Sequence, residues 1–348
     1  MHPLILKGHS KPIKSLIFNR ENDLLFSASS DRYITLWSSE YGERIGTYLH
    51  AAAVYTIDIT KDSKYLCSGD STGSIYFWET SNGELLKKIE LEPSYSIRSV
   101  NFNRLDNTLL LSYGGRSQQS ESGILIYNFE DILKSSCNDK KVITELKPLK
   151  TFLSPNKDKI TKTLWLNNDK NIISTSETGF IYNYDYENGK ILFQKKIHDS
   201  MIMDLDKSRK EEILLTASKD GKSKVLSYDN FEEIEVLIPE NPTRNINACR
   251  LSPFISDEDE NKIKFHAFIA GGQESREVTT THAKKGGFEL LIYNIMFGKE
   301  IGAIQGHFGP VNALAVSNDG ELLASGAEES SIRVHRINNE EYNNLDVR

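Results

Sequence analysis

The sequence is poor in cysteine and has no long apolar segment. Cys67, Cys137 and Cys249 are the only cysteines among 348 residues, and no two of them form a CxxC pair. An odd number of scattered cysteines indicates a reducing compartment. No stretch approaches the roughly 20 apolar residues that a membrane helix needs, and residues 1–9 lack the apolar segment of a secretory signal. We therefore expect a protein of the cytosol or nucleus that is not bound to a membrane.

Motifs that would hold a metal ion or a nucleotide are also missing. The sequence has neither the HExxH spacing of a zinc site nor the GxxxxGK[ST] spacing of a phosphate-binding loop. The net charge of −7 gives no general attraction to a phosphate backbone, and basic residues do not cluster with aromatic ones. We expect no metal, no cofactor and no direct contact with nucleic acid.

An internal repeat runs through the whole chain. The segment SASSDRYITLW, which ends at Trp37, is followed by related segments at intervals of 41, 49, 57, 42, 67 and 42 residues. A period of about 40–45 residues is typical of WD repeats, each of which supplies one blade of a β-propeller. The aligned final residues are Trp37, Trp78, Tyr127, Tyr184, Leu226, Tyr293 and His335.

Each repeat shows the pattern of short strands joined by tight turns. In residues 332–337 apolar and polar side chains alternate, which predicts a strand with one packed face. Asn82–Gly83 and Asn188–Gly189 predict two-residue hairpins in which both central residues have positive φ. The seven repeats therefore predict an all-β fold, a seven-bladed WD-repeat propeller.

The chain is expected to form a single domain over residues 1–348. Residues 3–337 would form the blades, and residues 338–348 would form a short C-terminal tail. Residues 4–7 have the pattern of an isolated strand just before Gly8–His9. We predict that this strand pairs with the last repeat beside residues 332–337 and so closes the propeller ring.

Four polar segments interrupt the repeat pattern and are expected to be surface loops. Insertions on a surface cost little stability, so these loops could be functional or mere spacers. They are residues 114–122, 135–142, 256–262 and 273–287.

Histidine and aspartate recur along the chain and raise the question of acid–base chemistry. His9, Ser27 and Asp31 could be taken for a Ser/His/Asp triad. We favour a structural interpretation, because the same residue types return with the blade period and vary between repeats. In a WD repeat, the turn aspartate, histidine, serine or threonine and tryptophan form a hydrogen-bonded network that satisfies buried polar groups. The residues assigned to this blade network are His9, Asp31, Trp37, His50, Trp78, His198, Asp220 and His307. No catalytic residue is predicted.

One group of acidic residues suggests an interaction surface. Asp204 and Asp206 are two positions apart on a predicted strand, and Asp220 follows in the next turn. Alternate residues of a strand share a face. That face is either solvated or receives a basic segment of a partner.

Two segments at the ends of the chain resemble a specific family. LKGHSKPIKSLIFNRENDLLFSASSD at residues 6–31, and AGGQESREVTTTHAKKGGFELLIYNIMFGKEIGAIQGHFGPVNALAVSNDG at residues 270–320, resemble the subunit i family of eukaryotic translation initiation factor 3. The GGQE–VTTT–FE–Y segment followed by GHFGP is specific to that family. Residues 90–250 match only in their blade pattern.

The resemblance implies a non-catalytic scaffold in the cytoplasm, within the initiation factor complex on the small ribosomal subunit. It implies two partners: the b subunit, through its C-terminal helix, and the g subunit. Asp204 and Asp220 stand at positions that match the family's acidic contacts for the b-subunit helix. Asp220 is also the expected turn aspartate of its own blade. Family members often have a charged helical tail, whereas here only six residues follow Tyr342.

Two other functions share the propeller fold. One is a generic WD-repeat adaptor in signalling or ubiquitin ligation, which would lack the GGQE–VTTT segment. The other is an RNA-binding propeller, which would need a basic, aromatic-rich patch.

Overall fold

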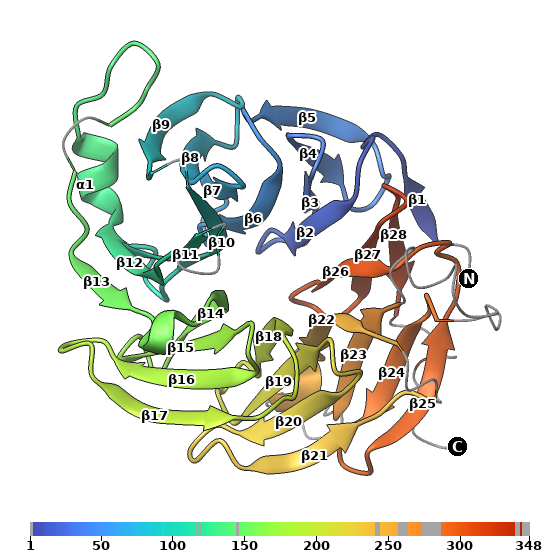
Figure 1. The fold of residues 1–348 in the computed structure, drawn as a ribbon. Helices are drawn as coiled ribbons and strands as arrows, with labels where there is room; N and C mark the ends of the chain where they lie inside the picture. The colour runs from blue at the N-terminus through green and yellow to red at the C-terminus, as the bar shows by residue number, and fades with distance from the viewer. Residues whose placement is uncertain are drawn as a thin grey trace. The chain divides into compact units, whose positions relative to one another are not determined.

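The computed structural model describes residues 3–92, 94–115, 117, 120–143, 146–240, 244–256, 264–272, 287–337 and 342. Within these residues, 28 strands form seven four-stranded sheets. The fold class is that of a seven-bladed β-propeller, as the repeat predicts (Figure 1). Residues 273–281 of the GGQE–VTTT motif lie outside the described residues.

The seven blades follow one another along the chain, with one exception at the N-terminus. Blade 1 consists of β2 (Ile13–Phe18), β3 (Leu24–Ser29), β4 (Tyr33–Ser38) and β5 (Arg44–Leu49). Blade 2 consists of β6 (Val54–Ile59), β7 (Tyr65–Asp70), β8 (Ser74–Glu79) and β9 (Leu85–Glu90). Blade 3 consists of β10 (Tyr95–Phe102), β11 (Thr108–Gly115), β12 (Ser122–Asn128) and β13 (Lys150–Leu153). Blade 4 consists of β14 (Ile160–Leu166), β15 (Asn171–Ser176), β16 (Phe180–Asp185) and β17 (Ile191–Lys196). Blade 5 consists of β18 (Ile202–Lys207), β19 (Ile213–Ser218), β20 (Ser223–Ser227) and β21 (Glu233–Leu237). Blade 6 consists of β22 (Ile246–Leu251), β23 (His266–Gly271), β24 (Leu290–Asn294) and β25 (Lys299–Ile304). Blade 7 consists of β26 (Val311–Val316), β27 (Leu322–Ala327) and β28 (Ile332–Arg336) together with the N-terminal strand β1 (Leu4–Leu6).

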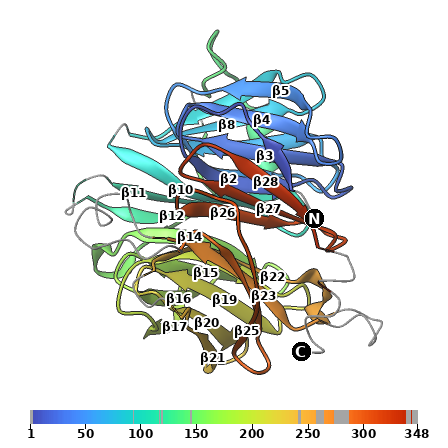
Figure 2. The same ribbon diagram turned by 90° about the vertical axis from the view of Figure 1, so that its right-hand side faces the viewer.

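The N-terminal strand completes the last blade. β1 runs antiparallel to β28, with Leu4 opposite Val334 and Leu6 opposite Ile332. The predicted pairing of the two ends of the chain is therefore confirmed. Residues of β2 pack with those of blade 7 in one apolar cluster that includes Leu6, Ile13 and Ile332. Figure 2 shows β2 close to β26, β27 and β28.

The chain divides into two compact units. Unit 1 comprises residues 1–25, 37–43 and 200–348 and holds blades 5, 6 and 7, and unit 2 comprises residues 26–36 and 44–199 and holds blades 2, 3 and 4. In each unit, neighbouring blades bury a shared apolar layer. Val225 and Leu237 of blade 5 pack with Ile246 and Ile269 of blade 6 in unit 1, for example. Since one sheet cannot hide both of its faces, this stacking is what stabilises the blades.

In five blades, the hairpin between the first two strands contains the same hydrogen bond from a side chain to the backbone. A side-chain oxygen accepts a hydrogen bond from the backbone N–H five residues later, as Asn19 does from Leu24 at 2.9 Å. Such bonds satisfy turn N–H groups that have no partner in the sheet. The same bond is made by Thr60, Asn103, Ser208 and Ser317.

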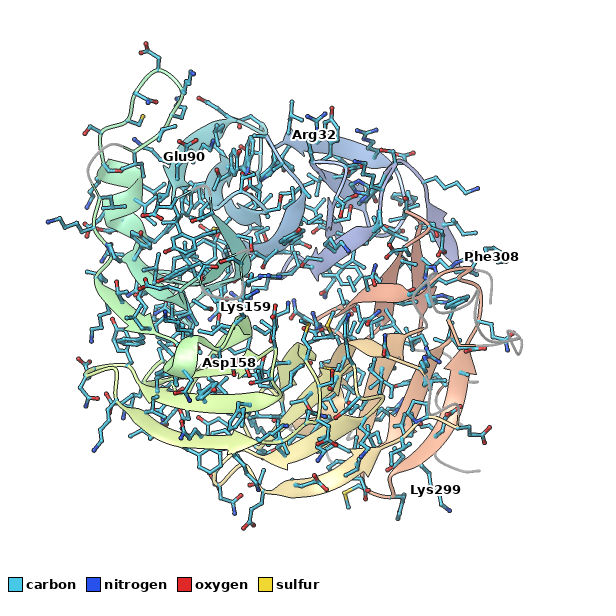
Figure 3. The ribbon with its side chains drawn as sticks, viewed as in Figure 1. Arg32, Glu90, Asp158, Lys159, Lys299 and Phe308 are labelled. Atoms are coloured by element: carbon cyan, nitrogen blue, oxygen red, sulfur yellow. The ribbon has the colours of Figure 1, made fainter. Side chains whose placement is uncertain are left out.

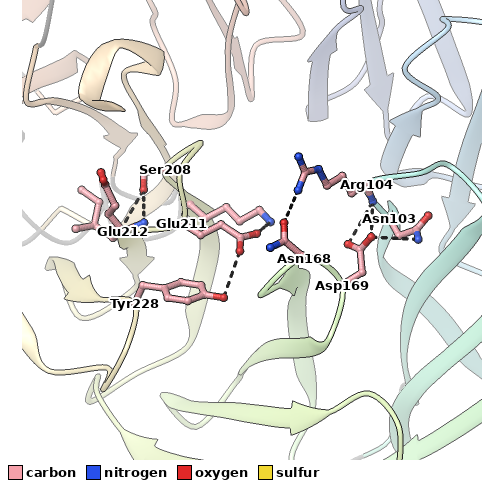
Figure 4. A network of polar contacts seen from close by, with 10 residues as sticks. Asn103, Arg104, Asn168, Asp169, Ser208, Glu211, Glu212 and Tyr228 are labelled. Atoms are coloured by element: carbon pink, nitrogen blue, oxygen red, sulfur yellow. Dashed lines mark hydrogen bonds and ion pairs between the residues drawn. The ribbon is translucent and has the colours of Figure 1, made fainter. Parts of the chain in front are cut away.

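These turns also bind one another within unit 2. The carboxylate of Asp169 in blade 4 accepts hydrogen bonds from the backbone N–H of Arg104 at 3.0 Å and from the side-chain amide of Asn103 at 3.2 Å, while the Arg104 guanidinium donates to the Asn168 side chain (Figure 4). In unit 1, the Glu211 carboxylate accepts a bond from the Tyr228 hydroxyl at 3.2 Å, also drawn in Figure 4.

The two Asn–Gly turns differ from the prediction. Gly83 and Gly189 have φ of 73° and 69°, but Asn82 and Asn188 are not among the residues with positive φ. The backbone N–H of Gly83 bonds to the carbonyl of Glu79, and the strands shift register between Phe77 and Trp78. Each hairpin is therefore a longer loop with a bulge, because the extra residues relieve the need for two left-handed residues.

The predicted loop at residues 135–142 covers the outer edge of blade 2. It follows the short helix α1 (Phe129–Lys134), and Lys88 of β9 exchanges backbone hydrogen bonds of 2.8 Å with Lys141 and Ile143. Figure 1 shows α1 and this loop beside β9 and β12. An exposed strand edge invites pairing with other chains, and this segment protects the edge of β9.

Candidate functional site

In blade 2 three residues of the predicted polar network are joined by internal bonds. The Ser68 hydroxyl lies 2.8 Å from Nε2 of His50 and accepts a hydrogen bond of 3.1 Å from Nε1 of Trp78. His50 is only 2% exposed, and burial lowers its pKa to about 3. A histidine that is neutral near pH 7 and enclosed in this way is suited to holding strands together rather than to moving protons.

Blade 7 has a related network with a glutamate in place of the turn aspartate. Nε2 of His307 lies 2.8 Å from the Ser325 hydroxyl, and Nδ1 lies 2.6 Å from Oε1 of Glu329. Burial disfavours the charge on Glu329, but hydrogen bonds from His307 and Ser331 hold its pKa below the ordinary value. His335 occupies the tryptophan position, and its pKa falls to about 4 because it is buried.

The loop that carries His307 also presents an aromatic residue. Phe308 is 84% exposed, and Figure 3 labels it. Phe308 belongs to the GHFGP motif. The histidine of that motif, His307, has a hydrogen-bond partner at each of its two ring nitrogens.

Blade 4 uses a different set of residues for the same purpose. The carboxylate of Asp158 accepts a hydrogen bond of 2.5 Å from the Thr178 hydroxyl and one of 3.0 Å from the Tyr182 hydroxyl. Asp158, labelled in Figure 3, lies just before β14, where blades 2 and 7 have histidine. In blade 4 the acidic group thus stands at the histidine position, and the Thr178 hydroxyl stands in the turn where blade 7 has Glu329.

In blade 1 the residues that could be taken for a triad make contacts that suit a structural role. The imidazole of His9 lies against the Trp37 indole, with ring centroids 6.4 Å apart. Asp31 accepts a hydrogen bond of 3.0 Å from the backbone N–H of Tyr33, and the Ser27 hydroxyl donates to the carbonyl of Thr35 at 3.3 Å. These bonds are local strand and turn contacts.

His198 and Asp220 also have backbone partners. His198 is 2% exposed, and its backbone N–H donates to the Gly179 carbonyl at 3.2 Å. Asp220 is partly exposed in the turn between β19 and β20, where its carboxylate accepts a hydrogen bond of 3.0 Å from the N–H of Lys222.

The two aspartates of β18 face the first strand of blade 6. Oδ2 of Asp204 accepts hydrogen bonds of 2.6 Å from the Arg250 guanidinium and 3.3 Å from the N–H of Cys249. Oδ2 of Asp206 accepts one of 2.8 Å from the N–H of Leu251. Asp204 is 4% exposed. The cation that Asp204 binds therefore belongs to the same chain, and we call these five residues the blade 5–6 seam.

The charged side chains of the blade 5–6 seam affect one another's pKa. Burial raises the pKa of Asp206. Burial alone would lower the pKa of Arg250, but the carboxylates of Asp204 and Asp206 raise it above its ordinary value. Arg250 is thus held in its charged form between two acidic groups.

The same arrangement recurs in blade 2, which the sequence pattern did not predict. Thr56 accepts a hydrogen bond of 3.2 Å from the N–H of Val100, and Asp58 accepts one of 2.6 Å from the N–H of Phe102. Asp58 and Asp206 each lie 20 residues before the aligned final residue of their repeat, Trp78 or Leu226. Aligning the repeats on their first strands would have revealed the match. Arg250 gave no such signal, because its partner lies in another repeat.

The C-terminal end of the long insertion in blade 6 is held by an ion pair with a buried arginine. The guanidinium of Arg244 contacts the Glu289 carboxylate at 3.3 Å, and the same carboxylate accepts a hydrogen bond of 2.7 Å from the N–H of Gly287. Burial lowers the pKa of Arg244, although the Glu289 charge opposes this. The residues between Gly272 and Gly287 lie outside the described part of the chain.

Tyr342 packs against blade 6. Tyr342 is 5% exposed; its hydroxyl lies 2.8 Å from Nδ1 of His266, and the Lys264 ammonium lies 4.3 Å from the centre of its ring. Of the predicted tail, residues 338–348, this is the one described residue, and it is anchored to a blade.

Among the described residues, no three histidine, cysteine, aspartate or glutamate side chains gather in a way that could hold a metal ion. No helix there is long and apolar enough to cross a membrane.

Comparison with known proteins gives one consistent result. The family model EIF3I matches residues 1–347. The chain is similar to proteins named eukaryotic translation initiation factor 3 subunit I from Nematostella vectensis, 33% identical over 336 residues, and from Schizosaccharomyces pombe, 32% identical over 338 residues. It is also 31% identical over 337 residues to the protein of that name from Xenopus tropicalis. In each case the match covers 96% of both chains. The chain belongs to the EIF3I family, whose members include eukaryotic translation initiation factor 3 subunit I.

Proposed function

We propose that this chain is a non-catalytic scaffold subunit of the eukaryotic translation initiation factor 3 complex in the cytoplasm. It docks other subunits during assembly of the initiation complex on the small ribosomal subunit. The observation that carries this proposal is the match of the family model to residues 1–347. The internally bonded histidines of blades 2 and 7 support the absence of acid–base chemistry.

The expected partners are subunit b, through its C-terminal helix, and subunit g. A rigid propeller suits such docking because its surface loses little conformational entropy on binding. An amphipathic helix would place its apolar side in a groove and its basic residues against acidic ones. In blade 5, Asp220 is the acidic residue that we assign to this contact, and its turn is partly exposed.

Calorimetric titration with a synthetic peptide of the subunit b C-terminal segment tests the proposal. We expect Asp220→Lys to weaken binding at least tenfold without changing the melting temperature by more than a few degrees. Asp229→Lys is the matched control, because Asp229 is an exposed turn residue of the same blade and carries the same charge. Equal binding by both variants would contradict the acidic contact, and no binding by the wild type would contradict the proposed function.

A further inference from the structure

The turn between β10 and β11 of blade 3 exposes an aliphatic side chain on a well-bonded backbone. Leu105 is 73% exposed. Within the turn, the N–H of Asn103 donates to the Thr108 carbonyl at 2.9 Å, and the N–H of Asp106 donates to the Asn103 carbonyl at 3.1 Å. A side chain carried by such a turn loses little conformational entropy when a partner covers it. Since a single exposed leucine is common on protein surfaces, its surroundings decide whether it is a contact.

The turns of the two neighbouring blades hold this turn from both sides. In blade 2, the N–H of Lys61 donates to Oδ2 of Asp106 at 2.8 Å. In blade 4, the Asp169 carboxylate accepts a hydrogen bond of 3.0 Å from the N–H of Arg104 (Figure 4). These bonds join three turns into one surface, which we call the turn platform. It comprises residues 61–64, 103–106 and 168–170.

The carboxylates of the turn platform are engaged by its backbone. Asp62, Asp106 and Asp169 each accept a hydrogen bond from a backbone N–H of these turns. Asp106 and Asp169 are also partly buried. The negative charges are therefore used to hold the turns together.

The cations of the turn platform, in contrast, are exposed. The Lys61 ammonium donates to the Arg104 carbonyl, and the Arg104 guanidinium donates to the Asn168 side chain, so both have neutral acceptors. Over the described ranges, no ion pair joins any of the four cationic side chains to a carboxylate; they are Lys61, Lys64, Arg104 and Lys170. The surface around Leu105 thus presents positive charge, although the chain as a whole has a net charge of −7.

An acidic protein segment fits this surface better than RNA does. Bases of single-stranded RNA stack on aromatic side chains, whereas the residues of the turn platform include no aromatic one and its apolar member is Leu105. Carboxylates, in turn, bind a guanidinium group through two parallel hydrogen bonds. A segment with an apolar residue beside acidic ones would cover Leu105 and place carboxylates against Lys61 and Arg104.

We propose that the turn platform docks a segment of another protein that carries an apolar residue flanked by aspartate or glutamate. Leu105 is the apolar anchor of this contact. Lys61 and Arg104 bind the flanking carboxylates, and Lys64 and Lys170 attract the segment as it approaches. The contact goes beyond the proposed function and does not depend on Asp220, so either proposal can fail without the other.

Differential selection of peptides on the full-length protein tests this proposal. A phage library of short random peptides is first depleted on the variant Leu105→Asp with Arg104→Glu and then selected on the wild type. We expect enriched sequences with aspartate or glutamate next to an apolar residue. In fluorescence anisotropy, the most enriched peptide should bind about tenfold more weakly to Leu105→Ala and about fivefold more weakly to Arg104→Gln.

Two variants of the outer strand of blade 4 are the matched controls. Leu192→Ala and Lys195→Gln remove exposed side chains of the same kinds and should bind the peptide like the wild type. Leu105→Ala should also melt like the wild type because its side chain is mostly exposed. The effect of this variant on binding therefore decides the proposal even if Arg104→Gln lowers the stability.

Three results would overturn the proposal. The first is a selection that enriches no sequence, and the second is one that enriches sequences without an excess of acidic residues. The third concerns RNA, with a fluorescein-labelled oligouridine as the probe. If the wild type binds this probe and Arg104→Gln weakens the binding, the turn platform is a nucleic-acid site and not a site for an acidic protein segment.

Discussion

Leu6 lies directly opposite Ile332, so the third residue of the first strand is paired with the first residue of the last. The N-terminal segment therefore contributes to a blade that is otherwise built from residues more than 300 positions later. The stability of blade 7 depends on both ends of the chain.

Deleting residues 1–7 should lower the melting temperature markedly, because blade 7 loses its outer strand. The narrower change Leu6→Ala should cost about 2–5 kcal/mol, the range for a buried leucine, since Leu6 is 2% exposed. Ile5→Ala is the control, because Ile5 is 45% exposed. Thermal and urea unfolding followed by circular dichroism measure both. An unchanged melt after the deletion would show that the pairing of β1 with β28 does not stabilise the fold.

Ser68→Ala should lower the stability of the protein more than the loss of a single oxygen atom would suggest. The substitution removes the oxygen shared by His50 and Trp78 and leaves two buried nitrogens without that partner. Each such group costs about 1–3 kcal/mol. Ser81→Ala in an exposed turn should have almost no effect. Similar urea midpoints for the two variants would refute the structural role assigned to this network.

Asp58 should make a contribution to the free energy of unfolding that is larger at low pH than at neutral pH. Burial raises its pKa from 3.8 to about 7, so the folded protein binds a proton that the unfolded chain releases between these values. The contribution of Asp58 to folding is then fully present below pH 4 and is lost as the pH rises toward 7, at about 1.4 kcal/mol per pH unit. Relative to Asp58→Asn, the wild type should gain stability between pH 7.5 and pH 5. Parallel urea titrations at these two pH values measure the difference, and a constant offset between the two proteins would contradict the shift.

Tyr342→Phe should weaken the contact between residue 342 and blade 6. The hydroxyl that is lost lies 2.8 Å from His266, and an orphaned buried nitrogen costs about 1–3 kcal/mol. Tyr342→Ala should cost more, because the ring also packs against Phe268. Limited proteolysis of the C-terminus together with thermal melts would detect both effects. Cleavage at the wild-type rate in Tyr342→Ala would show that this contact does not hold the C-terminus.

The sequence was sufficient for the architecture because each blade repeats the same local rules. Alternating apolar residues and turn residues at a period near 42 predict the strands of β27 and β28 without any knowledge of their neighbours. The pairing of β1 was also predictable, since a lone strand-like segment precedes the first repeat.

The contacts between blades were harder to predict from the sequence. Asp204 and Arg250 are 46 positions apart, and nothing in their local sequence indicates that they meet. Likewise, the loop at residues 135–142 was recognisable as an insertion, but its bonds to Lys88 depend on the three-dimensional proximity of blades 2 and 3. Periodicity specifies what each repeat does alone, whereas these contacts depend on how the repeats stack.

The most direct test of the central claim is sedimentation of an epitope-tagged copy of this 39.4 kDa chain from native lysate on a sucrose gradient. The scaffold account predicts that most of the tagged chain sediments with the small ribosomal subunit, and that purification from those fractions recovers subunits b and g in equal amounts with it. A tagged chain that remains at the top of the gradient, and that is recovered without either subunit, would contradict the account.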